Sequence, residues 1–164
     1  MKKMDNNGIL LCKIQADLFS HCDDFCSYSS YVFIRRFMNS DLANRFDDMT
    51  VLLEISSNET FIDEINSQYG ASTFGKKKKT DKEMMYWLGY VYRYWSYVYE
   101  IPSYLLFKHV QPHLILDRYA LYHSMGIDYF INRLIEEEEI YLPPHKTVDQ
   151  ILDEYIRFME EKDK

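Results

Sequence analysis

Apolar side chains recur every three or four positions along most of this chain, and that spacing is typical of amphipathic α-helices. The first such run extends from Ile9 to Phe25, and the second covers about residues 29–38. A shorter run follows Ser40-Asp41, a pair that can cap a helix. The stretch 51–55 is ambiguous, because it is short and β-branched at both ends. It could form a strand, but a single strand without an obvious partner is weak support for a sheet.

Capping boxes indicate three further helix starts. In such a box the Ser or Thr side chain accepts a hydrogen bond from an amide in the first turn, and the Glu or Gln three residues later accepts one from the amide of that Ser or Thr. They are Ser56-x-x-Glu59, Thr80-x-x-Glu83 and Thr147-x-x-Gln150. We expect the first of these helices to run to Tyr69 and to end at Gly70. Pro102 and Pro112 stand where later helices would begin, and Gly126 would break the second of those.

These signals predict an all-α fold. We expect a compact bundle of about seven to eight helices over residues 1–142. After it, residues 143–164 should form a Pro-Pro linker and an appended, acidic C-terminal amphipathic helix. A chain of 164 residues suits one domain with an added element, and it is long enough to bury a core without a disulfide or a metal.

The net charge of −7 is unevenly distributed. Residues 1–135 hold sixteen acidic and fifteen basic side chains, whereas residues 136–164 hold ten acidic and four basic ones. A nearly neutral body with an acidic tail does not favour binding to nucleic acid or to an anionic membrane, but a basic partner for the tail is plausible.

The three cysteines form no regular framework, which favours a reducing compartment. No apolar run has the length of a secretory signal or of a membrane span, so we expect a cytoplasmic protein. His21, Cys22 and Cys26 invite a zinc interpretation, but a second ligand pair is missing. Cysteine as a small buried side chain is the better interpretation of these positions, and we expect neither a metal nor a cofactor.

The stretch 86–100, YWLGYVYRYWSYVYE, carries eight Tyr or Trp residues around a single arginine. On a helix, one apolar face is accompanied by a second stripe made of Tyr86, Tyr90, Arg93 and Tyr97. The pattern favours a central buried helix, in which Arg93 would need Glu100 or an acid from another helix as its partner. Alternatively, the stripe lines a groove that holds a partner, since Tyr and Arg are common at binding hot spots.

His123 and the expected tail helix are further candidates for a functional role. His123 lies near the expected helix end at Gly126 and suits a structural or capping role; as a general base it would need Asp117, Asp128 or Ser124 nearby. The tail helix would either pack back on its own domain or dock in a partner's groove through Val148, Ile151, Leu152, Tyr155 and Met159.

Three segments resemble a group of small uncharacterised bacterial helical proteins associated with toxin–antitoxin-like operons. They are FIRRFMNSDLANRFDD (33–48), YWLGYVYRYWSYVYE (86–100) and YALYHSMGIDYFI (119–131). Part of the resemblance is to helical proteins found beside ADP-ribosyltransferase-like toxins. It covers about residues 28–136 and implies a neutralising or accessory partner. Ser124 departs from the group's pattern, which has threonine after the histidine.

We therefore expect a non-enzymatic protein-binding module, an antitoxin-like or accessory partner that neutralises a toxin, with no catalytic residue assigned. The expected partner-binding residues are Tyr86, Tyr90, Arg93, Tyr97, His123, Val148, Ile151, Leu152, Tyr155 and Met159. The alternative is a toxin or nucleotide-acting enzyme with a pocket around Arg93 and His123. A homodimer that uses the aromatic helix as its interface is a third possibility.

Overall fold

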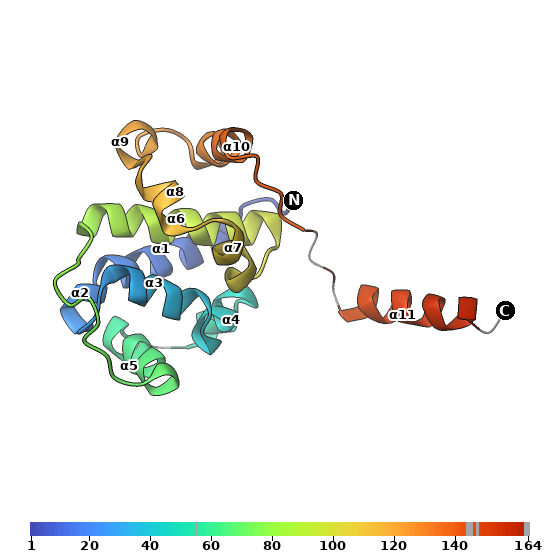
Figure 1. The fold of residues 1–164 in the computed structure, drawn as a ribbon, viewed down its shortest axis with the longest axis horizontal. Helices are drawn as coiled ribbons and strands as arrows, with labels where there is room; N and C mark the ends of the chain where they lie inside the picture. The colour runs from blue at the N-terminus through green and yellow to red at the C-terminus, as the bar shows by residue number, and fades with distance from the viewer. Residues whose placement is uncertain (55, 144–145, 147, 163–164) are drawn as a thin grey trace.

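The computed structural model describes residues 1–54, 56–143, 146 and 148–162, and within them the protein is all-α, as predicted. Figure 1 shows a body of short helices from which the last helix extends. The helices are α1 (Asn6–Ser20), α2 (Cys22–Phe25), α3 (Ser30–Met38), α4 (Asp41–Asp47), the 3₁₀ helix η1 (Thr50–Leu53), α5 (Asn58–Tyr69), α6 (Lys82–Tyr99), α7 (Ser103–His109), α8 (Pro112–Leu116), α9 (Tyr119–Tyr122), α10 (Ile127–Glu137) and α11 (Val148–Lys162).

Helices α1 and α6 form the centre of the body and pack along most of their lengths. Their backbones approach closely at Gly89, where an added Cβ would lie 2.8 Å from the ring of Phe19 and 3.0 Å from the Cα of Ala16. Gln15 fastens the same crossing, because its Nε2 donates to the Gly89 carbonyl over 3.1 Å. A small residue at this position therefore sets the distance between the two central helices.

Aromatic rings join the helices on one side of this pair. Phe19 of α1 meets Phe33 and Phe37 of α3 edge-on at 5.2 and 5.1 Å, and Phe37 meets Phe46 of α4 at 5.4 Å. Phe46 in turn contacts Phe61 of α5 at 5.9 Å. This continuous run of edge-to-face contacts holds α3, α4 and α5 against α1.

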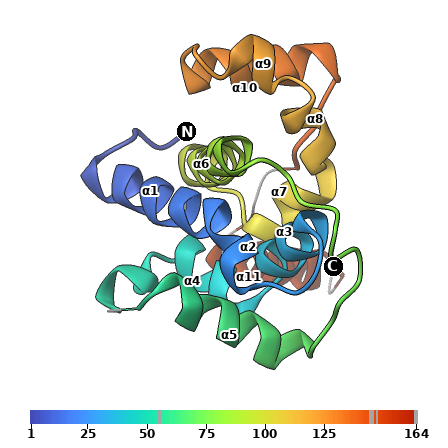
Figure 2. The same ribbon diagram turned by 90° about the vertical axis from the view of Figure 1, so that its left-hand side faces the viewer.

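The last helices of the body cover the opposite side of α6, as Figures 1 and 2 both show. The indole of Trp87 contacts the rings of Tyr119 in α9 and Phe130 in α10, at 5.4 and 4.9 Å between centroids. Tyr92 donates from its hydroxyl to the Val110 carbonyl over 2.6 Å. Helix α6 is thus covered from both sides, which explains why it is apolar almost all round.

Two predicted helices are each divided in the structure. The run from Ile9 to Phe25 breaks at His21, where the Ser20 hydroxyl donates to the Asp17 carbonyl and His21 Nδ1 also lies 2.9 Å from it. Side chains that compete for a backbone carbonyl in this way weaken a helix. The helix that begins at Pro112 breaks before α9, because Arg118 donates from its own guanidinium to the Leu114 carbonyl.

Two of the predicted capping residues lie one position before the residues that cap the helices in the structure. Ser57, and not Ser56, accepts from the Thr60 amide to open α5. Asp81, and not Thr80, accepts from the Glu83 and Met84 amides to open α6. Thr147, in the third predicted capping box, lies outside the described residues. In the stretch with the strand alternative, residues 51–53 belong to η1 and Glu54 follows it in an extended conformation, while Ser40 caps α4 as predicted.

Helix α11 is the appended C-terminal amphipathic helix that the sequence predicted, and it contributes no buried residue. In Figure 1 it extends away from the body, beyond the end of the molecule where the N-terminus lies. In Figure 2 the same helix lies behind the body, so the two views agree. Whether residues 143–164 form a separate unit remains a prediction.

We expect Gly89→Ala to lower the free energy of unfolding by about 1–3 kcal/mol, because the new methyl group overpacks the α1–α6 contact. Gly126→Ala is the matched control, since nothing lies within 4 Å of a Cβ there. It should cost less than about 1 kcal/mol. Urea unfolding followed by circular dichroism measures both. Equal stability of the two variants would contradict the close packing described for α1 and α6.

Candidate functional site

Arg93 lies inside the body, with 1% of its surface exposed. Its guanidinium is held by three helices other than its own. Nε donates to Gln15 of α1 over 2.7 Å, Nη1 to Asp47 of α4 over 2.6 Å, and Nη2 to Ser103 of α7 over 2.8 Å. The guanidinium carbon also lies 5.4 Å from the ring centroid of Phe46. A buried charge needs such partners, and here they tie four helices together.

Both carboxylate oxygens of Asp47 accept hydrogen bonds, just as every nitrogen of the Arg93 guanidinium donates one. One of its oxygens accepts from the Ser103 hydroxyl over 2.6 Å, and the other accepts from the Ser103 amide over 2.9 Å. The amide belongs to the first turn of α7, where helix N–H groups have no intrahelical partner. Asp47 thus neutralises Arg93 and stabilises the start of another helix. The expected acidic partner is therefore supplied by a second helix, and Glu100 instead ends α6 as an exposed residue in the left-handed conformation.

The predicted aromatic stripe does not form an open groove. Tyr97 is buried, and the N-terminal segment covers it: Lys2 Nζ lies 4.1 Å from the centroid of its ring, and its hydroxyl donates to Asp5 over 2.7 Å. Bonds from the Gly8 amide and from this hydroxyl lower the pKa of Asp5. Tyr90 is half-buried and Tyr86 is the exposed member of the stripe. Because Arg93 and Tyr97 are buried, the four residues do not form one continuous exposed surface, and their role in binding a partner remains a prediction.

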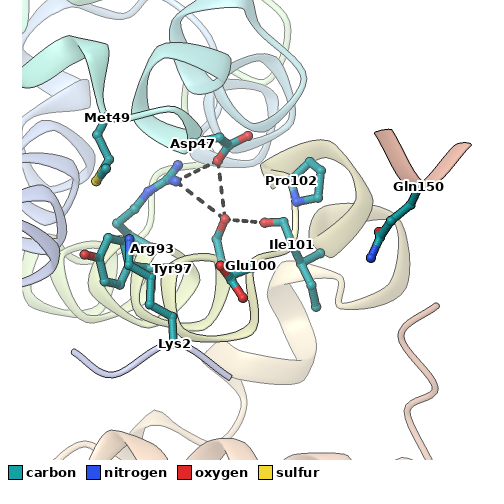
Figure 3. Close-up of a pocket in the computed structure, with 10 residues that line it drawn as sticks. Lys2, Asp47, Met49, Arg93, Tyr97, Glu100, Ile101, Pro102 and Gln150 are labelled. Atoms are coloured by element: carbon teal, nitrogen blue, oxygen red, sulfur yellow. Dashed lines mark hydrogen bonds and ion pairs between the residues drawn. The ribbon is translucent and has the colours of Figure 1, made fainter. Parts of the chain in front are cut away.

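A pocket of about 410 Å³ lies beside the Arg93–Asp47 pair, at the end of the body nearest α11. Figure 3 shows Arg93 and Asp47 facing each other, with Gln150 of α11 on the other side of Pro102. The charged groups that line it include Arg93 and Asp47, which are already engaged with each other, and Lys2, which lies over the Tyr97 ring. The pocket therefore presents mainly satisfied groups to a ligand.

His123 is exposed at the end of α9 and lies apart from this pocket, whose lining residues do not include it. Its ring stacks on Tyr119 at 4.4 Å, and Nδ1 lies 2.7 Å from the Tyr119 carbonyl. Asp128, which could have oriented it, instead accepts from the hydroxyl of Tyr94. Arg93 lines this pocket and His123 does not, so this cavity does not join the two residues; the alternative of a toxin or nucleotide-acting enzyme remains a prediction.

The three cysteines are buried thiols. Burial raises the pKa of Cys12 to about 12, and burial likewise raises the pKa values of Cys22 and Cys26. His21 contacts Asp17 and Ser20. In the part of the chain that the structure describes, no group of three or more His, Cys, Asp or Glu residues could hold a metal ion.

The terminal helix α11 carries the largest set of exposed apolar side chains on one element. The five predicted anchors are between 42% and 79% exposed, and Ile156 and Phe158, which the sequence interpretation left out, widen their face. A helical wheel places 156 and 158 about 80° to either side of the face centre, so the wheel could have found them. Residues 148–162 hold five acids and two bases, a net charge of 2 − 5 = −3. Six of these seven charges lie opposite the apolar face.

No protein-family model, no curated protein and no solved structure matches this chain. The resemblance to proteins of toxin–antitoxin-like operons therefore remains a prediction. Among the helices of the described residues, none is both long enough and apolar enough to cross a bilayer. The cytoplasmic location also remains a prediction.

We expect Asp47→Ala to lower the free energy of unfolding by about 3–5 kcal/mol, because it leaves the Arg93 guanidinium buried without its carboxylate. Adding Arg93→Met should recover part of that loss, since the unpaired charge is then removed. Lys82→Ala, which breaks a half-exposed pair with Asp24, is the control and should cost less than about 1 kcal/mol. Urea unfolding at pH 7 measures the wild type, the single variants Asp47→Ala and Arg93→Met, the double variant and the control. Additive losses in the double variant would show that the pair is not coupled.

We expect the native thiols to react with an aromatic disulfide reagent at pH 8 at least about 100-fold more slowly than in urea, because the thiolate is the reactive form. Below a pKa of about 12, the thiolate fraction of Cys12 rises tenfold with each pH unit. The native rate should therefore still increase between pH 8 and pH 10, while the rate in urea levels off. A native rate equal to the rate in urea would contradict the burial described here.

Proposed function

We propose that this chain is a non-enzymatic, antitoxin-like protein-binding module and that α11 is its principal docking element. The observation that carries the proposal is the exposure of the whole apolar face of α11, which contributes no buried residue to the body. A helix of fifteen residues is marginal by itself in water, so a face of this kind gains stability only when another surface covers it.

The chemistry of α11 defines the surface that would receive it. Each large apolar side chain that moves from water into a groove contributes about 1.5–3 kcal/mol, before the cost of association. The acids nearest the border of the apolar face, Asp149, Glu154 and Glu160, favour a groove whose rim carries lysine or arginine. The partner is thus a protein with an apolar groove and a basic rim, and α11 binds in that groove.

The resemblance of residues 28–136 supports a toxin as that partner. A neutralising protein has to hold its target, and a rigid body that presents one protruding helix suits that role. The interior of the body agrees with a binding role for α11. The polar groups around Arg93 are hydrogen-bonded to one another, so this cluster offers no group for catalysis. The body then acts as a carrier that fixes where α11 begins.

The test compares three full-length proteins as baits in the cell of origin. Ile151→Asp/Tyr155→Asp places charges in the centre of the apolar face, whereas Asp153→Asn/Arg157→Gln changes only the polar face. We expect the wild type and the polar-face variant to retain one common basic protein, and the apolar-face variant to bind it at least about 100-fold more weakly. Titration of the purified partner gives these affinities.

Co-expression then tests the neutralising role. We expect the captured protein to arrest growth when it is produced alone. Production of the wild-type chain should relieve that arrest, and production of the apolar-face variant should not. Equal capture by all three baits would remove α11 from the interface, and a partner that is harmless by itself would remove the antitoxin role.

A further inference from the structure

A second surface of the molecule complements α11, and it lies on the loop that joins α5 to α6. Four consecutive lysines occupy positions 76–79. Lys79 is engaged, since its ammonium donates to the carbonyls of Cys26 and Tyr28 and pairs with Asp23. The other three, 76–78, are exposed, and no ion pair is formed by their side chains within the described residues. The loop therefore carries three unneutralised positive charges.

The loop is held in a defined shape, which distinguishes it from a solvated charge run. The Ser29 amide donates to the Phe74 carbonyl over 2.9 Å, and the Ser30 amide donates to the Lys78 carbonyl over 3.2 Å. Gly75 adopts φ +66 and lies against Ser29, where a Cβ would approach to 2.9 Å. The backbone between these contacts is thus fixed against the start of α3.

An apolar side chain accompanies the free lysines. Phe74 is 77% exposed although both neighbouring stretches of the loop are anchored. Ala71 and Ser72 of the same loop line a pocket of about 380 Å³, together with Phe25 and one acid, Asp63. Basic charge next to an exposed ring and a pocket is the chemical complement of an acidic helix with an apolar face.

The two complementary surfaces lie at opposite ends of the molecule. Figure 1 shows the α5–α6 loop at the end of the body away from α11, and in Figure 2 the loop is in front while α11 is behind. Contact between them within one molecule requires α11 to leave its position, whereas a second copy meets the loop without rearrangement. Pairing of two α11 helices is disfavoured, since each carries a net charge of −3.

We propose that α11 of one molecule docks on the Phe74–Lys78 loop of a second copy, head to tail. The contact is heterologous, so each copy offers one free loop and one free helix, and assemblies grow as open chains or closed rings. The proposal rests on the docking role of α11 proposed above and adds its regulation. In the absence of a partner, self-association covers the apolar face of α11, and a partner with a basic rim competes for it.

Sedimentation of full-length variants tests this contact. The helix variant is Ile151→Asp/Tyr155→Asp, and the loop variant is Lys76→Glu/Lys77→Glu/Lys78→Glu; both change exposed side chains outside the core. We expect the wild type to gain mass with concentration and each variant to remain monomeric. An equimolar mixture of the two should form a dimer and nothing larger, because the helix variant retains an intact loop and the loop variant an intact helix.

Salt and charge-conserving controls sharpen the result. We expect the dissociation constant to rise at least about tenfold between 0.05 and 0.5 M salt, because exposed charges are screened. Lys76→Arg/Lys77→Arg/Lys78→Arg should associate like the wild type, and a peptide of residues 146–164 should dissociate the assemblies. Circular dichroism and urea unfolding establish that every variant is folded.

Three results would overturn the proposal: a wild type that stays monomeric at about 0.5 mM, association that persists unchanged in either variant, or a mixture that forms no dimer. A monomeric protein that still captures a basic partner through α11 would remove this inference and leave the proposed function. Head-to-tail association without capture of any partner would do the reverse.

Discussion

The charge of Arg93 is the constraint around which the body is built. A guanidinium with 1% exposure would be prohibitively costly by itself, and the three groups that hold it at 2.6–2.8 Å come from different parts of the chain. Asp47 has to end α4 beside it, Ser103 has to begin α7 there, and Gln15 has to face inward from α1. Those requirements fix the relative positions of four helices. No single partner can be removed without a second loss, because each one makes a further hydrogen bond: Gln15 to the Gly89 carbonyl, and Asp47 with Ser103.

The helical content was predictable from periodicity, and the role of α6 as a central helix follows from its apolar residues on nearly every side. The need of Arg93 for an acid from another helix was predictable too. The identity of that acid was not, since Asp47 is 46 residues away and no local pattern joins the two. The divisions at His21 and Arg118 also escaped prediction, because at both places a side chain contacts a backbone carbonyl four residues earlier, which no apolar periodicity signals.

The candidate site was predicted unevenly for the same reason. The exposed apolar side chains of α11 share one local periodicity, so their common face was predictable and only its breadth was underestimated, while their role as anchors remains a prediction. The stripe through Tyr97 looked equally regular, but its exposure depends on what folds over it. The N-terminal segment does so: the Lys2 amide donates to the Val98 carbonyl over 2.6 Å and its side chain lies over the Tyr97 ring. Helical periodicity predicts on which side of its helix a residue lies, but it does not predict whether another segment of the chain covers that side.

The exposed position of α11 has a consequence for turnover. A helix that buries none of its own side chains opens at almost no free-energy cost, while the core helices open only when the whole body unfolds. Cellular proteases cut backbone that is transiently extended, so an uncovered α11 is cut before the body. Under the proposed docking role, a covered α11 is shielded in proportion to the time it spends docked. The lifetime of the uncut chain would then measure how much of it is bound.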